Sequence, residues 1–172
     1  MKFMNNIVLL TGRGGSSLKD KNLKKIYGKP ICAYPCIAAK KSEVFNHFFC
    51  SSDSDKILNI AGSLGFTQIK RPKHLSGSKS LHVDVIKHAL MKMKKNKIYP
   101  DTLTVLMANT ATITPQILKK SLKILNNNKN LTSVVPVIQE QDHHPFRAKR
   151  IDKKGNLKSY FNYKHRISSN RQ

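Results

Sequence analysis

The sequence contains few acidic residues: 9 Asp and Glu stand against 32 Lys and Arg in 172 residues, a formal net charge of +23. Such a balance points to an anionic partner, such as a nucleoside triphosphate, an acidic sugar, a nucleic acid or a membrane surface. The lysines are scattered along helical stretches rather than held in one block. Most of them therefore reflect a composition rich in Lys, Asn and Ile, and only a subset near a phosphate-binding loop is expected to matter for function.

Long apolar runs are lacking near the N-terminus. The run Ile7–Leu10 is too short for the core of a signal peptide and far too short to span a bilayer. The sequence therefore predicts a cytoplasmic protein with no membrane partner.

Cysteine and aromatic residues are also scarce. Cys32, Cys36 and Cys50 match no zinc or redox spacing, so free, buried thiols in a reducing compartment are expected. Aromatic residues make up 7%, and no RNA-binding signature is present. Hydrophobic residues make up 39%, enough for a buried core, and the length fits a single domain over 1–172.

Apolar runs alternate with helical periodicity along the chain. Strands are predicted at Asn6–Leu10, Phe48–Ser51, Thr67–Lys70, Leu103–Met107 and Ser133–Ile138, with a weak signal at Ala148–Ile151 before a turn at Gly155–Asn156. Helices are predicted at Ile31–Lys41, Asp55–Leu64, Leu81–Lys94 and Pro115–Asn126, the second capped by Ser52 or Asp53. This alternation predicts an α/β fold with a mostly parallel sheet and helices on both faces.

Three polar segments lie at the carboxyl ends of predicted strands: Gly12–Ser17, Ser51–Asp53 and Asn109–Thr112. Ligands of such sheets bind at the carboxyl ends of the strands. The coincidence of the three segments predicts a binding site at that edge.

The segment Gly12–Ser17 is rich in glycine and has the features of a phosphate-binding loop. Its glycines let main-chain N–H groups surround an anion, and Arg13 can clamp phosphate oxygens with two hydrogen bonds. The alternative is an ordinary turn between a strand and a helix. The segment is neither a Walker loop nor a dinucleotide fingerprint, because no Gly-Lys-Ser/Thr follows and the third glycine is replaced by Ser17.

Several short motifs together resemble the CMP-acylneuraminate (CMP-sialic acid) synthetase family of cytidylyltransferases, and they keep that family's order along the whole chain. They are Arg13–Ser16, Lys21–Leu23, Gly28–Pro30, Ser51–Asp53, Arg71–Pro72, Val83–Val85, His88–Leu90, Ser133–Val135, His143–Pro145 and Arg171–Gln172.

The resemblance implies a glycosyltransferase-A-like nucleotidyltransferase fold in which CTP, with Mg²⁺, donates CMP to an acidic nonulosonic-type sugar and releases pyrophosphate. It implies nucleotide contacts from Gly12, Arg13, Gly14, Gly15, Ser16, Ser17, Lys21, Asn22, Arg71 and Asn109. Arg13 and Lys21 are the residues expected to act on the reacting phosphates. Lys149, Arg171 and Gln172 are expected to bind the sugar acid, since a guanidinium suits a carboxylate. The resemblance also implies a homodimer, with the substrate and dimer-contact region beginning at 139–172.

Three departures from the family pattern affect these expectations. The lysine that usually follows Gly-Gly-Ser is Ser17. The glutamine that contacts the sugar in the family is Ala108, which suggests a different sugar or an altered way of binding it. The chain ends at Gln172, before the family's metal-binding aspartates, so we expect a shortened chain with no metal ligands of its own. Asp53 and Asp84 are better explained as caps or hydrogen-bond acceptors, and the pair His143–His144 as part of a contact loop.

Two alternatives remain open. The missing aspartates favour a non-catalytic or inactive nucleotide-binding domain of the same fold. The net charge alone motivates a nucleic-acid-binding protein, which would bind DNA or RNA with a steep dependence on salt.

Overall fold

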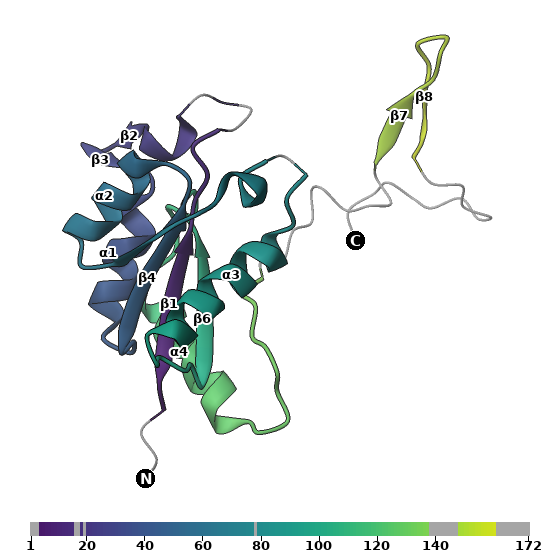
Figure 1. Cartoon of the computed structure of the whole chain (residues 1–172). Coiled ribbons are helices and arrows are strands. Elements are labelled where there is room, and N and C mark those ends of the chain that lie inside the picture. The colour runs from purple at the N-terminus through teal and green to yellow at the C-terminus, as the bar shows by residue number, and fades with distance from the viewer. Residues whose placement is uncertain (1–3, 16–17, 19, 78, 138–147, 161–172) are drawn as a thin grey trace. The chain divides into compact units, whose positions relative to one another are not determined.

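The computed structural model of the chain (Figure 1) describes residues 4–15, 18, 20–77, 79–137 and 148–160. The chain falls into two compact units, Met1–Val134 and Val135–Gln172. The expected start of a substrate and dimer-contact region at residue 139 stays a prediction. A single nucleotidyltransferase domain over 1–172 stays a prediction.

Four parallel strands form the sheet of the first unit, in the spatial order β5-β4-β1-β6. β1 (Asn6–Thr11) lies between β4 (His47–Ser52) and β6 (Thr102–Met107), and β5 (Thr67–Lys70) lies at the edge beside β4. Because β1 is paired on both sides and covered on both faces, Ile7–Thr11 are buried, which explains their continuous apolar sequence. The predicted α/β fold with a mostly parallel sheet is confirmed.

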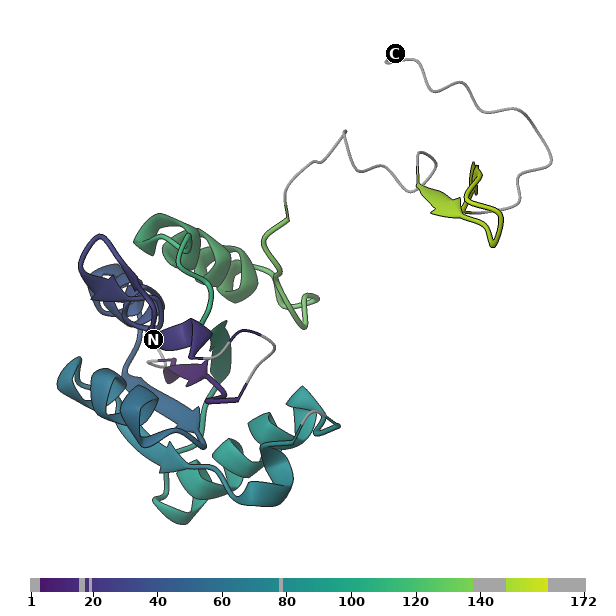
Figure 2. The same ribbon diagram turned by 90° about the horizontal axis from the view of Figure 1, so that it is seen from above.

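Helices cover both faces of this sheet, as Figure 2 shows. Val8 and Leu10 of β1 point into a core shared with α1, α2 and α4, whereas Ile7 and Leu9 point to the other face, against α3. The alternation follows from the two-residue period of a strand. The helices span α1 (Ala33–Ser42), α2 (Asp55–Ser63), α3 (His82–Lys95) and α4 (Pro115–Asn127).

Short elements complete the described part of the chain. They are the 3₁₀ helices η1 (Lys21–Leu23) and η2 (Lys73–Leu75), the hairpin of β2 (Lys25–Ile26) and β3 (Lys29–Pro30), and the hairpin of β7 (Lys149–Ile151) and β8 (Leu157–Ser159). The second hairpin turns at Gly155, which has a φ of 81°, as the turn prediction required.

Two local predictions were wrong. Residues 133–137 form no strand, and Ile138 lies outside the described residues. Val135 and Val137 are 72% and 87% exposed, so the apolar run has no buried face, and Pro136 cannot donate a hydrogen bond to a ladder. The N-cap position of α2 is Ser54, not Ser52 or Asp53.

The three cysteines are free and buried, as predicted. Burial raises the pKa of Cys32 to about 11 and of Cys50 to about 12, and it also raises the pKa of Cys36. All three thiols are therefore protonated at neutral pH. None of the helices that the structure describes is long and apolar enough to cross a membrane.

Candidate functional site

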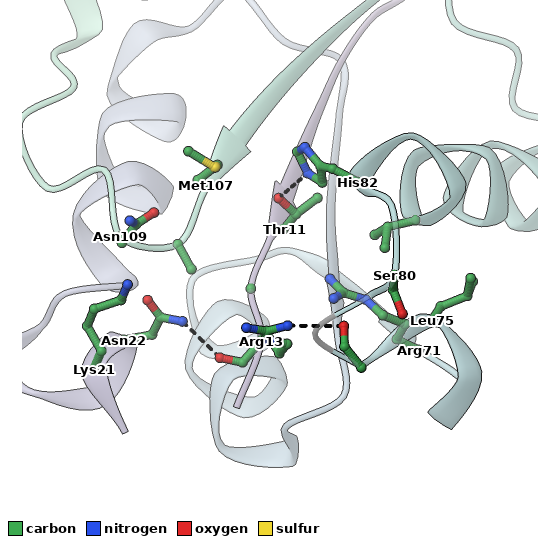
Figure 3. A pocket seen from close by; sticks show the side chains of 14 residues that line it. Thr11, Arg13, Lys21, Asn22, Arg71, Leu75, Ser80, His82, Met107 and Asn109 are labelled. Carbon is green, nitrogen blue, oxygen red and sulfur yellow. Dashed lines mark hydrogen bonds between the residues drawn. The ribbon is translucent and has the colours of Figure 1, made fainter. Parts of the chain in front are cut away.

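A pocket of about 230 Å³ lies at the carboxyl ends of β1 and β6 (Figure 3). The chain builds β4 and β5 on one side of β1 and then crosses back to β6 on the other side. Such a reversal leaves a crevice at the ends of the two strands, where α/β proteins bind ligands. The lining residues are Thr11, Gly12, Arg13, Lys21, Asn22, Arg71, Leu75, Gly77, Ser80, His82, Val85, Met107, Ala108 and Asn109.

The glycine-rich loop after β1 is tied to the end of β4 by its main chain. The Gly12 N–H donates to Ser51 O over 3.1 Å, and the Gly14 N–H donates to Asp53 Oδ1 over 3.0 Å. A β-carbon at Gly12 would lie 2.9 Å from Ala108 Cβ, closer than carbon atoms approach without displacement. The first glycine is therefore required by packing, and the contact with Asp53 fixes the course of the loop.

Arg13 bridges two segments of the pocket wall. Its Nε donates to Gly15 O over 2.6 Å, and its Nη1 donates to Gly77 O over 3.1 Å. Asn22 Nδ2 donates to Arg13 O over 3.0 Å, so η1 holds the main chain of Arg13 in place. Because a guanidinium has five N–H donors, these two bonds leave donors for an anion.

Lys21 and Asn22 face the pocket from η1. Asn22 is 8% exposed, and within the described residues its buried Oδ1 has no hydrogen-bond partner. A buried acceptor without a hydrogen bond lowers the stability of the folded state. A ligand that donates a hydrogen bond to this oxygen would remove that cost, so the oxygen is a candidate ligand contact. Lys21 adds a flexible ammonium charge beside it.

Arg71 is buried, with 7% of its surface exposed. Its Nη2 donates to Ser51 O over 2.8 Å, and its Nε donates to Ser51 Oγ over 3.4 Å. Burial lowers the pKa of the guanidinium, and the nearby carboxylate of Asp53 opposes this shift. An arginine still remains charged at physiological pH. Among the described residues, the pocket wall carries the basic side chains of Arg13, Lys21 and Arg71.

Thr11 and His82 line the pocket, although sequence reasoning did not single them out. His82 Nε2 lies 3.0 Å from Thr11 Oγ1, and the Thr11 hydroxyl donates to Leu106 O over 3.3 Å. The only available signal was position: Thr11 precedes the glycine loop directly, and His82 opens a predicted helix.

The pocket gathers Gly12, Arg13, Lys21, Asn22, Arg71 and Asn109 from the residues predicted to bind nucleotide, and Gly14 and Gly15 lie in the loop beside it. Lys149 belongs to the second unit, on β7. The predicted residues Ser16, Ser17, His143, His144, Arg171 and Gln172 lie outside the described residues.

The described residues do not fit a metal site. Among them, no group of three or more His, Cys, Asp or Glu side chains is placed to hold an ion. None of the described residues that line the pocket carries a carboxylate. Asp53 instead accepts the Gly14 N–H, which is the structural role of hydrogen-bond acceptor expected of it. Asp84 lies in the first turn of α3, and its expected role as a cap or acceptor stays a prediction.

Comparison with known proteins gives a consistent result. The profile of a protein family described as cytidylyltransferase matches residues 7–172. Post-translational flagellin modification protein B of Campylobacter coli is 33% identical over 132 residues, which cover 74% of this chain and 56% of that protein. CMP-N,N'-diacetyllegionaminic acid synthase of Campylobacter jejuni is 34% identical over 89 residues, 51% of this chain and 38% of that protein.

The fold also matches solved structures. CMP:2-keto-3-deoxy-manno-octonic acid synthetase, solved in complex with CTP, superposes with a TM-score of 0.58 at 21% identity, covering 73% of this chain and 49% of that one. At this identity the match shows the fold alone. The aligned part of this chain covers 56% of the Campylobacter coli protein and 49% of the octonic acid synthetase, so the chain spans about half the length of these relatives.

Proposed function

Given that this chain belongs to the cytidylyltransferase family, we propose that it binds CTP and transfers CMP to an acidic nonulosonic-type sugar with release of pyrophosphate. One observation carries the proposal: a pocket at the switch point of the sheet is lined by Arg13, Lys21 and Arg71 beside a glycine-rich loop. This arrangement suits a triphosphate, which brings several negative charges and many acceptor oxygens.

In this proposal, Arg13 and Lys21 contact the triphosphate and act on the reaction. The leaving pyrophosphate gains charge as the bond to the α-phosphate breaks, and fixed cations stabilise that charge in the transition state. We propose that Gly12, Gly14, Gly15, Ser16 and Ser17 of the glycine-rich loop also contact these phosphates. Asn22 accepts a hydrogen bond from the nucleotide through its unpaired Oδ1, and Arg71 adds a buried positive charge to the pocket.

We propose Lys149, Arg171 and Gln172 as contacts for the sugar acid, because their cationic and amide groups suit a carboxylate and hydroxyls. The position of the family's sugar-contacting glutamine is Ala108, which is 1% exposed and packs against Gly12. A methyl group there makes no hydrogen bond. The sugar must therefore be recognised by other groups, which supports a substrate different from sialic acid within the same acidic class.

Mg²⁺ belongs to the proposal only through the family resemblance. The described residues offer it no carboxylate cluster, and the charge in the pocket comes from basic side chains. We therefore assign no reaction step through a metal ion to these residues. We propose that the basic side chains of the pocket bind and orient the triphosphate.

We also propose that the protein forms a homodimer through the hairpin of β7 and β8. Ile151 and Leu157 face each other across the two strands, and each is 73% exposed. A two-stranded hairpin has marginal stability in water unless its apolar face is covered. Analytical ultracentrifugation should find a dimer that dissociates when Ile151 and Leu157 are changed to Ser, and a monomeric unchanged protein would end this part of the proposal.

A non-catalytic nucleotide-binding domain is the second candidate, and the lack of a carboxylate cluster in the described part of the chain favours it. The two are separated by measuring pyrophosphate release from CTP with a nonulosonic acid and Mg²⁺. We expect release that depends on the sugar and is lost in Arg13→Ala. Selective CTP binding without any release would select the non-catalytic domain, and activity with another triphosphate would contradict both.

A further inference from the structure

The hairpin of β2 and β3 turns through two residues, Tyr27 and Gly28, that both have positive φ angles, 46° and 77°. Two-residue turns of this kind favour Asn-Gly, Asp-Gly or Gly-Gly, because a bulky side chain is strained at positive φ. Tyr27 nevertheless occupies the first position and is 94% exposed. A tyrosine so exposed adds little to the stability of the fold, so the strain indicates a role in contacting another molecule.

Hydrogen bonds hold the hairpin in place within the first unit. The Tyr34 hydroxyl of α1 donates to Ile26 O, and the Ile31 N–H donates to Lys24 O over 2.9 Å. Figure 1 shows the hairpin at the periphery of the unit, so its turn is a fixed projection. A fixed projection loses little conformational entropy when it contacts a partner, which favours binding.

Positive charge surrounds the turn. Lys24, Lys25 and Lys29 are exposed, and Ile26, which is 41% exposed, precedes Tyr27. These five residues form what we call the tip surface. No Asp or Glu occurs in the sequence from the start of η1 to the end of α1. The tip surface thus combines an apolar and aromatic centre with three lysines, a composition that fits an anionic partner.

An anionic lipid bilayer fits the tip surface better than a nucleic acid does. Lysines near a bilayer are attracted by its anionic lipids, and a tyrosine settles at the headgroup level, with its ring in the apolar layer and its hydroxyl in water. An exposed isoleucine also gains by leaving water there. Nucleic-acid sites read bases through Arg, Asn and Gln, or stack successive bases on several aromatic rings. The tip surface has one ring and none of those three residue types.

We propose that the tip surface docks this protein on an anionic lipid bilayer, with Ile26 and Tyr27 entering the headgroup layer and the three lysines contacting lipid phosphates. Such a peripheral contact needs no segment that crosses the bilayer. It departs from the expectation of no membrane partner, which rested only on the shortness of the apolar run near the N-terminus. The inference does not depend on the proposed nucleotide site, and it is tested without nucleotide.

The chain contains no tryptophan, so a single introduced indole can report on the tip surface. The fluorescence of Tyr27→Trp is recorded with vesicles of phosphatidylglycerol and phosphatidylcholine in equal parts, and with vesicles of phosphatidylcholine alone. We expect emission to move to shorter wavelength with the anionic vesicles only, because the indole enters the headgroup layer. Tyr99→Trp, at another exposed tyrosine of the same unit, is the matched control and should not shift. An unshifted Tyr27→Trp spectrum, or a shift with single-stranded RNA instead of vesicles, would overturn the proposal.

Co-sedimentation with the same anionic vesicles separates docking from the general attraction that a net charge of +23 causes. Changing the three lysines of the tip surface to Gln should lower the partition coefficient at least about tenfold. Changing Lys92, Lys94 and Lys95 of α3 to Gln removes the same charge and should lower it far less. Equal losses in the two triple variants would contradict docking through the hairpin.

Tyr27→Asn keeps the charge of the tip surface and places a favoured residue in the turn. We expect this variant to be at least as stable as the original chain in denaturant unfolding, and to bind the anionic vesicles about tenfold more weakly. Unchanged vesicle binding would show that the tyrosine does not enter the bilayer, and the proposal would fail while the nucleotide site stands.

Discussion

Gly14 donates its main-chain N–H to Oδ1 of Asp53 over 3.0 Å, which joins the loop after β1 to the residue that follows β4. The two residues are 39 positions apart in sequence, and each follows a strand of the parallel pair β1 and β4. The carboxylate also lies near the guanidinium of Arg71. Asp53 thus holds the loop and balances one cation of the pocket.

Replacing Asp53 separates these two roles. Asp53→Ala removes the acceptor, so we expect a stability loss of about 1–2 kcal/mol and weaker CTP binding, because the loop is released. Asp53→Asn keeps an oxygen for Gly14 and removes only the charge, so CTP binding should be retained or improved. Chemical denaturation and calorimetry measure the two effects. An Asn variant that binds CTP as poorly as the Ala variant would contradict a role in holding the loop.

Gly12 and Ala108 form a tightly packed pair between the ends of β1 and β6. A β-carbon at Gly12 would lie 2.9 Å from Ala108 Cβ and 3.3 Å from Ile57 Cγ2. We therefore expect Gly12→Ala to destabilise the fold by about 1–3 kcal/mol, as overpacking does. The double variant Gly12→Ala/Ala108→Gly relieves the closer contact and should recover part of the loss. Equal unfolding free energies of the single variant and the original chain would show that the pair is not tight.

Arg13 is the cation whose removal tests the triphosphate site. Its free N–H donors are expected to contact the phosphates, so Arg13→Ala should weaken CTP binding about 10- to 100-fold, the cost of a charged hydrogen-bonding group. Arg13→Lys should recover only part of this, because an ammonium lacks the forked donor geometry. Lys94→Ala removes an exposed cation of α3 and controls for net charge. Equal losses for Arg13→Ala and Lys94→Ala would indicate non-specific attraction.

The buried thiols predict a loss of stability in alkaline solution. Burial raises the pKa of Cys32 to about 11 and of Cys50 to about 12, above the ordinary value of 9.0. Above about pH 9 the unfolded chain releases these protons and the folded chain keeps them, so the unfolding free energy falls as pH rises. The slope is at most about 1.4 kcal/mol per pH unit for each thiol.

Denaturant unfolding between pH 8 and about pH 10.5 measures this slope, and the variant with all three cysteines changed to Ala is the control. The two proteins differ only at the three cysteines, so the difference in slope is assigned to the thiols. We expect the variant to be less stable at neutral pH but to lose less stability with rising pH. Parallel curves would contradict buried, protonated thiols.

The sheet and its helices could be predicted because their signals are local. The apolar run Ile7–Leu10 forms a central strand, and Thr114 followed by Pro115 marks the start of α4, where the Thr114 hydroxyl accepts the Ile117 N–H over 3.3 Å. The run Ser133–Ile138 misled the same reasoning, because residues 133–137 are apolar in part but lack a partner strand and a buried face.

The site was predictable only in part. The glycine loop and Arg13 carry a recognisable sequence pattern, whereas His82 becomes significant only through a contact with Thr11, which lies 71 positions earlier. Likewise Asp53 was expected to cap α2, but the fold turns its carboxylate toward Gly14 instead. Tertiary contacts of this kind have no local sequence signal.

A thermal-shift titration of the chain with CTP, UTP, ATP and GTP tests the central claim most directly. A ligand present at 100 times its dissociation constant stabilises the folded state by about 2.7 kcal/mol, which gives a clear shift. The proposed nucleotide site predicts that CTP raises the melting temperature most and that Arg13→Ala, at the same CTP concentration, gives a clearly smaller shift. Equal shifts with all four triphosphates, or no shift with any of them, would contradict it.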